Sequence, residues 1–223
     1  MTAMHDKLQR SIRATHDVLD ERLSTAEFRR PSPARPRDIF PATDTFLASA
    51  SRHLAAANAV LVPAMARHLP DGPELTRTFS RTSRDLEQAM AQTKAKLYGE
   101  AHAIHRPWSE IWSDLHSRFN AFMELEERVA RALVENTSDA FCDDLADRVY
   151  GAELHSPTRP HPFVPHRGIP GRVARRICLG VDHFWDATEG RMIPEPIKPH
   201  DRDHDGRLTQ YLLADPHLPE DDA

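Results

Sequence analysis

The chain has 223 residues, a formal net charge of −5, 8 glycines and 2 cysteines, which suits one helical domain with appendages better than two full-sized domains. Basic and acidic residues are mixed throughout, so there is no basic stripe that would collect phosphates, and nucleic acid is not expected as a partner. There is no long apolar run of the kind that spans a bilayer and no secretory signal at the start, so we expect a soluble, cytoplasmic protein.

Apolar residues recur at helical spacing over the first 150 or so positions and predict five helices. Prolines between residues 31 and 36 end the first helix, and the run Pro70-Asp71-Gly72-Pro73 ends the second. Pro63 lies inside the second helix and is expected to kink it. The helices are predicted over residues 4–26, 42–68, 74–105, 107–135 and 138–154.

Residues typical of helix N-termini stand at the predicted starts of the fourth and fifth helices. Pro107 suits the first turn of the fourth helix, and Ser138 or Asp139 suits the cap of the fifth. Each of the four long helices has one apolar stripe, which it can bury only against the others. The predicted fold class is therefore all-α, an antiparallel up-down four-helix bundle with a fifth helix over residues 1–154.

Residues 155–223 differ in composition from the helical domain. Five prolines between positions 157 and 170 predict an extended linker, and apolar residues at helical spacing predict a short amphipathic helix over 170–188. The Pro- and Asp-rich residues that follow predict a disordered tail. We therefore expect a second region that is a Pro-rich, partly disordered C-terminal extension.

A polar residue interrupts the apolar stripe of each long helix. These residues are His16, His53, Ser83 and Glu126 in chain order. A carboxylate at a core position needs a partner, and facing helices of a bundle can hold a metal between them. With a rise of about 1.5 Å per residue, His16 and His53 should lie level, whereas Ser83 should be displaced by roughly 9 Å.

The second and fourth stripes resemble the motifs of the hemerythrin-like, or HHE cation-binding, family. In that family each of these helices carries a histidine followed four residues later by glutamate, often a pair. His53-Leu-Ala-Ala-Ala57 keeps the histidine and lacks the glutamate. Phe122-Met-Glu-Leu-Glu126-Glu127 keeps the glutamates and lacks the histidine. Each motif therefore retains half of its metal-binding residues.

The first and third helices complete the resemblance. His16-Asp-Val-Leu19 is similar to the His-x-x-Leu of the family's first helix, and Ser83 stands where the third helix would supply its histidine. The resemblance implies a four-helix bundle whose di-iron site is incomplete, because Phe122, Ala57 and Ser83 cannot replace the missing ligands. Reversible dioxygen binding at two irons is therefore not expected.

Two hypotheses for function follow. The leading hypothesis is a hemerythrin-like protein that has largely lost its di-iron site. Such a protein would be soluble and non-catalytic, would hold no cofactor, and would bind an unknown protein or small-ligand partner. The alternative is a residual mononuclear or di-iron cation-binding protein, acting in oxygen or redox sensing or in metal handling, with iron as the cofactor. In the alternative the metal ligands are His16, His53, Glu126 and Glu127.

A structural explanation for the polar residues also stays open. The two histidines would bond to each other or to Ser83, and Glu126 would bond to one of them or to an arginine.

Three other features of the sequence are weaker evidence for a function. Asp201 to Leu208 copies half of a calcium-binding loop but has Leu212 where a glutamate is needed. Membrane-surface binding by residues 170–188 is a third, disfavoured alternative, and Cys142 and Cys178 are expected to be ordinary thiols.

Overall fold

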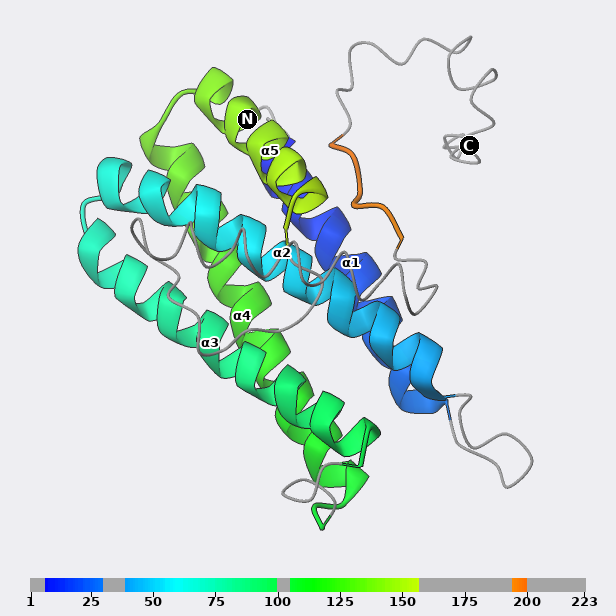
Figure 1. The fold of residues 1–223 in the computed structure, drawn as a ribbon. Helices are drawn as coiled ribbons and strands as arrows, with labels where there is room; N and C mark the ends of the chain where they lie inside the picture. The colour runs from blue at the N-terminus through cyan, green and yellow to red at the C-terminus, as the bar shows by residue number, and fades with distance from the viewer. Residues whose placement is uncertain (1–6, 30–38, 100–104, 157–193, 200–223) are drawn as a thin grey trace, which may run out of the picture.

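The structure is a computed structural model that describes residues 7–29, 39–99, 105–156 and 194–199. These residues form five α-helices and no β-strand (Figure 1). Among them, no helix has the length and apolarity needed to cross a membrane. The helices are α1 (Lys7–Phe28), α2 (Ile39–His68), α3 (Gly72–Leu97), α4 (Trp108–Asn136) and α5 (Asp139–Leu154).

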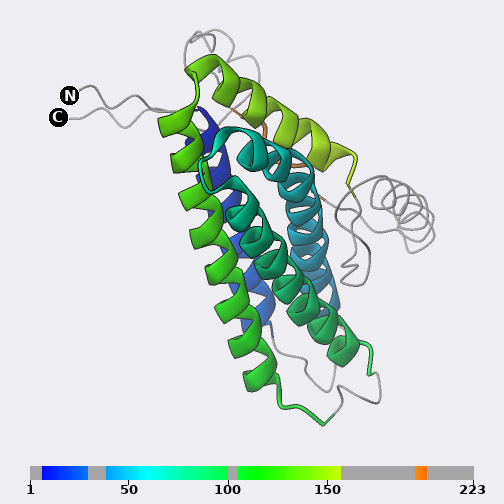
Figure 2. The same ribbon diagram turned by 90° about the vertical axis from the view of Figure 1, so that its left-hand side faces the viewer.

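The four long helices run in alternating directions and lie lengthwise against one another (Figures 1 and 2). α2 packs against α1 and α3, and α4 packs against the same two helices. α5 returns from the end of α4 and packs mainly on α2 and α1. The residues between 194 and 197 lie beside α1, α2 and α5.

Burial confirms the predicted apolar stripes. The stripe predicted for α4 is at most 3% exposed from Trp112 to Leu133, whereas its first residue, Trp108, is only partly buried. The apolar residues of the stripes predicted for α1 and α2 are also buried: Leu8, Ile12, Leu19 and Leu23, and Phe46, Ala50, Ala57, Val60 and Ala64. Side chains at helical spacing remove their apolar surface from water only if they share one face, so the helix packing follows directly from the sequence pattern. Four phenylalanines are among the largest fully buried side chains: Phe46, Phe79, Phe119 and Phe122.

Several helix boundaries differ from the predictions: α1 ends at Phe28 instead of residue 26, α2 begins at Ile39 instead of residue 42, and α3 begins at Gly72 instead of residue 74. The third helix was predicted to reach His105, but α3 ends at Leu97 and Gly99 follows with a φ of +74°. Glycine adopts this left-handed conformation without steric cost, which explains why the chain turns there. Pro107 is not in the first turn of α4 but precedes it, in extended conformation with a ψ of 147°.

The end of α2 at His68 and the cap of α5 lie where the sequence predicted them. α2 continues through Pro63 to His68, so this proline does not end the helix. Gly72 begins α3 so close to α2 that a Cβ there would collide with the carbonyl oxygen of Met65. Ser138 caps α5, since its side chain accepts a hydrogen bond from the backbone N–H of Phe141.

Candidate metal centre

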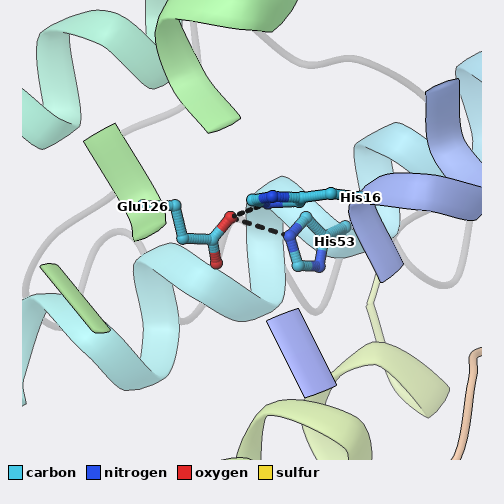
Figure 3. Close-up of side chains that lie close together, drawn as sticks. All are labelled: His16, His53 and Glu126. Atoms are coloured by element: carbon cyan, nitrogen blue, oxygen red, sulfur yellow. Dashed lines mark hydrogen bonds and ion pairs between the residues drawn. The ribbon is translucent and has the colours of Figure 1, made fainter. Parts of the chain in front are cut away.

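Three of the four polar stripe residues meet inside the helical core. His16 of α1 and His53 of α2 both direct Nε2 at the same oxygen of Glu126 on α4 (Figure 3). The distances to Glu126 Oε2 are 3.0 Å from His16 and 2.8 Å from His53. The two imidazole rings lie at 5.6 Å, edge to face. All three residues are at most 4% exposed, so the group is shielded from water.

A second carboxylate contacts each imidazole at its other nitrogen. His53 Nδ1 lies 2.6 Å from Glu153 Oε1 of α5, and both residues are buried. His16 Nδ1 lies 3.4 Å from Glu127 Oε1, and Glu127 also lies 3.8 Å from the guanidinium of Arg13. Glu153 therefore makes a short, buried contact, whereas Glu127 makes a longer one at the solvent edge. Both contacts fix the orientation of a ring.

The hydrogen bonds determine the charge of His53. An ionised carboxylate can only accept a hydrogen bond, so it bonds a ring nitrogen that carries a proton. His53 lies within hydrogen-bond distance of a carboxylate at both nitrogens, an arrangement that favours its imidazolium form. Burial disfavours this charge, but the charge of Glu126 and hydrogen bonds to Glu126 and Glu153 outweigh it and raise the pKa of His53 to about 10.

The carboxyl group of Glu126 is shifted in the opposite direction. Burial by itself would raise its pKa, but the charge of His53 and hydrogen bonds from His16 and His53 lower the pKa to about 2. Glu126 is thus a carboxylate although its side chain is 0% exposed. Its charge is compensated by the imidazolium beside it.

One oxygen of Glu126 is left over. Glu126 Oε1 has no hydrogen-bond partner among the residues that the structure describes, and in Figure 3 it points away from both rings. A buried carboxylate oxygen without a partner is unusual, because its desolvation is not offset. The site therefore retains acceptor capacity that its own side chains do not use.

Aromatic side chains occupy the neighbouring positions toward α3. Phe122, one turn before Glu126, packs its ring 6.2 Å from that of His53 and 5.5 Å from that of Phe79. Ser83 is fully buried, but its hydroxyl donates to the carbonyl oxygen of Phe79 in its own helix. The Ser83 hydroxyl is therefore engaged by its own helix and not by the polar cluster.

The geometry suits a metal ion. One nitrogen or oxygen atom from each of His16, His53 and Glu126 lies within 4.8 Å of the others. Ligands at about 2.1 Å from one ion are separated by roughly 3 to 3.4 Å, depending on the coordination geometry. The two N···O distances of 2.8 and 3.0 Å are hydrogen bonds, and small shifts of these side chains would bring them to that separation. Two imidazoles and one carboxylate also form a ligand set typical of mononuclear non-haem iron.

Sequence reasoning identified the centre of this cluster but not all of it. His16, His53 and Glu126 come together, whereas Glu127 lies at the far nitrogen of His16 and outside the group of three. Glu153 was missed. It continues the buried stripe of α5, four residues after Val149, so the rule that singled out Glu126 would also have found it.

Several predicted features lie outside the described residues. These are the calcium-loop likeness at 201–212, the amphipathic helix at 170–188 and Cys178. Cys142 is described and is buried. Comparison with known proteins gave no match to a protein-family model, a curated protein or a solved structure.

Proposed function

We propose that the protein is a hemerythrin-like four-helix bundle that binds one divalent transition-metal ion through His16, His53 and Glu126. The observation that carries this proposal is the convergence of both Nε2 atoms on one oxygen of Glu126. The geometry thus favours cation binding, the alternative hypothesis from the sequence, over a binding protein without a metal. The role is metal handling or redox sensing, and we assign no catalytic residue to it.

The contacts around the two histidines support a metal role over a purely structural one. Metal-binding histidines commonly donate their second N–H to a carboxylate, which fixes the ring and makes it a better ligand. Glu153 stands in that position for His53, and Glu127 does so more loosely for His16. A structural ion pair would need one carboxylate for one imidazolium. Here three carboxylates surround two rings.

The charges and the unused oxygen point the same way. The carboxylates of Glu126 and Glu153 are both buried, and their two negative charges would balance a divalent ion. Metal binding requires unprotonated imidazole, so the ion would replace the positive charge that His53 carries without it. Glu126 Oε1 could serve as a further ligand atom. The cluster thus contains an acceptor atom, Glu126 Oε1, that its own hydrogen bonds do not use.

A single ion is favoured over a pair. A second site would need ligands from the positions of Ala57, Ser83 and Phe122, whose side chains are buried but offer no imidazole or carboxylate. The Phe122 ring contacts the His53 ring. A bound ion of this class would supply Lewis acidity or one-electron redox chemistry, while His16, His53 and Glu126 would hold it.

Metal analysis tests this proposal. Protein purified after iron supplementation, and metal-free protein titrated with Fe²⁺ under anaerobic conditions or with Co²⁺, should bind close to one ion per chain. His53→Ala and Glu126→Ala should each abolish binding. The matched control is His116→Ala, since His116 pairs with Glu27 at 2.8 Å in a half-exposed setting away from the cluster.

Two results would contradict the proposal. One is substoichiometric metal in the wild-type protein under all these conditions. The other is undiminished binding in both His53→Ala and Glu126→Ala, which would place the ion elsewhere. Circular dichroism of each variant distinguishes loss of the ligand from loss of the fold.

A further inference from the structure

A segment from far along the chain lies beside the proposed metal site. Residues 194–199 form neither helix nor strand (orange in Figure 1). Residues 194–197 line a small cavity together with residues of α1, α2 and α5. The cavity measures about 20 Å³, which is room for about one water molecule. The segment therefore lies close to the helices and leaves little space beneath it.

Two members of the polar cluster face the segment across this cavity. His53 and Glu153 both line it, although they are only 2% and 4% exposed. His53 is a ligand of the proposed metal site, and Glu153 is the carboxylate at its Nδ1. The segment therefore stands over the side of the cluster that His53 and Glu153 form.

One hydrogen bond joins the backbone of the segment to α2. The guanidinium of Arg52, the residue before His53, donates from Nη1 to the carbonyl oxygen of Pro194 at 2.8 Å. This bond lies at the exposed surface, where water competes for both groups and the net gain in stability is small. Most of the attachment must therefore come from side-chain packing.

The packing side chains lie in the second half of the segment. Pro196 and Ile197 are half-buried and Pro199 is buried, whereas Lys198 is exposed. Both half-buried residues also line the cavity. Burial of this partial kind gives only part of the free energy of a fully buried side chain. The segment can therefore leave the helices without disturbing the core beneath it.

The composition of the segment also suits reversible docking. Three of its six residues are prolines, at positions 194, 196 and 199. Proline has no backbone N–H, so an extended segment that contains it leaves fewer donors without a partner when it packs on a helix. Its fixed φ also reduces the conformational entropy that is lost on docking. The segment can thus bind to the helices through few contacts.

We propose that residues 194–199 act as a cover that controls how fast a metal ion enters and leaves the site of His16, His53 and Glu126. This inference rests on the proposed function, because it concerns the same ion. A hydrated divalent cation keeps several waters around it and does not fit a cavity with room for about one. The segment must therefore move aside before the ion can pass.

A cover has a kinetic signature that differs from that of a ligand. The three proposed metal ligands come from α1, α2 and α4, and none comes from the segment. If the ion binds equally well with the segment docked or released, loosening the segment leaves the affinity unchanged. The rate constants of binding and release then rise by the same factor.

Stopped-flow binding of Co²⁺ to metal-free protein, and its release to saturating EDTA, tests the proposal. Ile197→Ser should raise both rate constants about tenfold and change the dissociation constant by less than about threefold. Ile197→Val, which keeps most of the apolar surface, should stay within about threefold of wild type. Lys198→Ser is the matched control, because this neighbouring side chain is exposed.

A second measurement needs no metal. Ser49 lines the same cavity and is 7% exposed, so Ser49→Cys places a thiol beneath the segment. Alkylation of that thiol by iodoacetamide, followed at this position by peptide mass spectrometry, reports how often the segment opens. Adding Ile197→Ser should speed the alkylation about tenfold, and adding Lys198→Ser should leave it unchanged.

Three results would overturn the proposal. Unchanged metal exchange in Ile197→Ser would mean that the ion takes another route, and unchanged alkylation would mean that the segment does not cover the cavity. A loss of affinity as large as the gain in release rate would mean that Ile197 acts on the ligands instead of on access. If wild-type protein binds no metal, the proposed function fails, and the alkylation rates still decide whether the segment is a cover.

Discussion

The core contains two adjoining regions, one made of buried charged groups and the other of buried aromatic rings. Toward α1, α2 and α5 it holds charged groups, with Glu126 bonded to two imidazoles and Glu153 bonded to one of them. Toward α3 it holds Phe79 and Phe122, with rings 5.5 Å apart. The ring of Phe122 also contacts that of His53, so it forms the border between the regions.

The difference shows what each region contributes. Aromatic packing stabilises the fold without requiring a particular partner atom, because the gain follows from area and close contact. The charged region gains little net stability, because desolvation offsets most of the attraction between its groups. It does fix donor and acceptor atoms to within a hydrogen-bond length. The aromatic region thus serves stability, and the charged region is suited to binding.

Removing Glu126 should have the largest effect. Glu126→Ala leaves a buried imidazolium with Glu153 alone, and breaking a buried ion pair in this way costs about 3–5 kcal/mol. Urea unfolding of metal-free protein measures the loss. Glu127→Gln is the control, since this half-buried residue should change the free energy of unfolding by less than about 1 kcal/mol. Equal effects of the two substitutions would show that the cluster is not energetically special.

Truncating Phe122 should sharpen the contrast. Phe122→Ala removes a ring that is 1% exposed and should also cost about 3–5 kcal/mol. Its response to metal should differ, however. Metal at about 100 times its dissociation constant should stabilise this variant by about 2.7 kcal/mol, as for wild type, and should not stabilise Glu126→Ala. Thermal unfolding with and without Co²⁺ measures this, and stabilisation of Glu126→Ala by metal would contradict the assignment.

The pH dependence of stability should come from the charged region. The pKa of His53 is raised to about 10, so its contribution is complete below about pH 6.5, the value for the unfolded chain, and is lost as pH rises toward 10. The folded state then holds one more proton than the unfolded state, and the free energy of unfolding should fall by up to about 1.4 kcal/mol per pH unit.

Acidification should lower the stability of the protein through Glu126, the carboxylate that His53 contacts. The pKa of Glu126 is lowered to about 2, so its contribution is present above about pH 4.5 and is lost as pH falls toward 2. Stability of the metal-free protein should therefore be highest between these windows, at about pH 4.5–6.5. Urea unfolding across pH tests this, and the alkaline decrease should be much reduced in Glu126→Gln. An equally steep decrease in that variant would assign it to other groups.

Substituting Glu153 should have a smaller effect. Glu153→Gln keeps the side chain's size but removes the charge that accepts from His53 Nδ1, and we expect a loss of about 1–3 kcal/mol in unfolding free energy. Metal affinity should fall about 10- to 100-fold without loss of stoichiometry, as for other carboxylates that orient ligands. Co²⁺ titration distinguishes this result from complete loss of the site, which would make Glu153 a ligand itself.

Helix positions were largely predictable from sequence because burial leaves a periodic trace. The stripes of α1, α2 and α4 fall where the spacing placed them. The end of α3 was not predictable in this way. Tyr98 and Gly99 carry no proline signal, and the turn depends on a left-handed glycine that could equally have continued the helix. The sequence alone does not decide between the two conformations.

The cluster was predictable in its members but not in its geometry. A polar residue at an apolar stripe position is visible in a sequence, and this signal identified His16, His53 and Glu126. Whether Glu126 lies level with the histidines depends on two connections and on Pro63, which local spacing does not determine. Glu153 shows the opposite case, since it stands on the buried stripe of α5 at helical spacing from Val149 and is visible in the sequence in the same way.

The link between α4 and α5 consists of Thr137 and Ser138 alone, and this brevity has a consequence for how the molecule assembles. The two carboxylates that contact His53 lie on α4 and α5, which this short link joins, whereas both imidazoles belong to α1 and α2 at the opposite end of the chain. Neither half carries a complete set of donors and acceptors. The cluster can therefore form only when the two halves dock, so any signal from it would report this long-range step of folding.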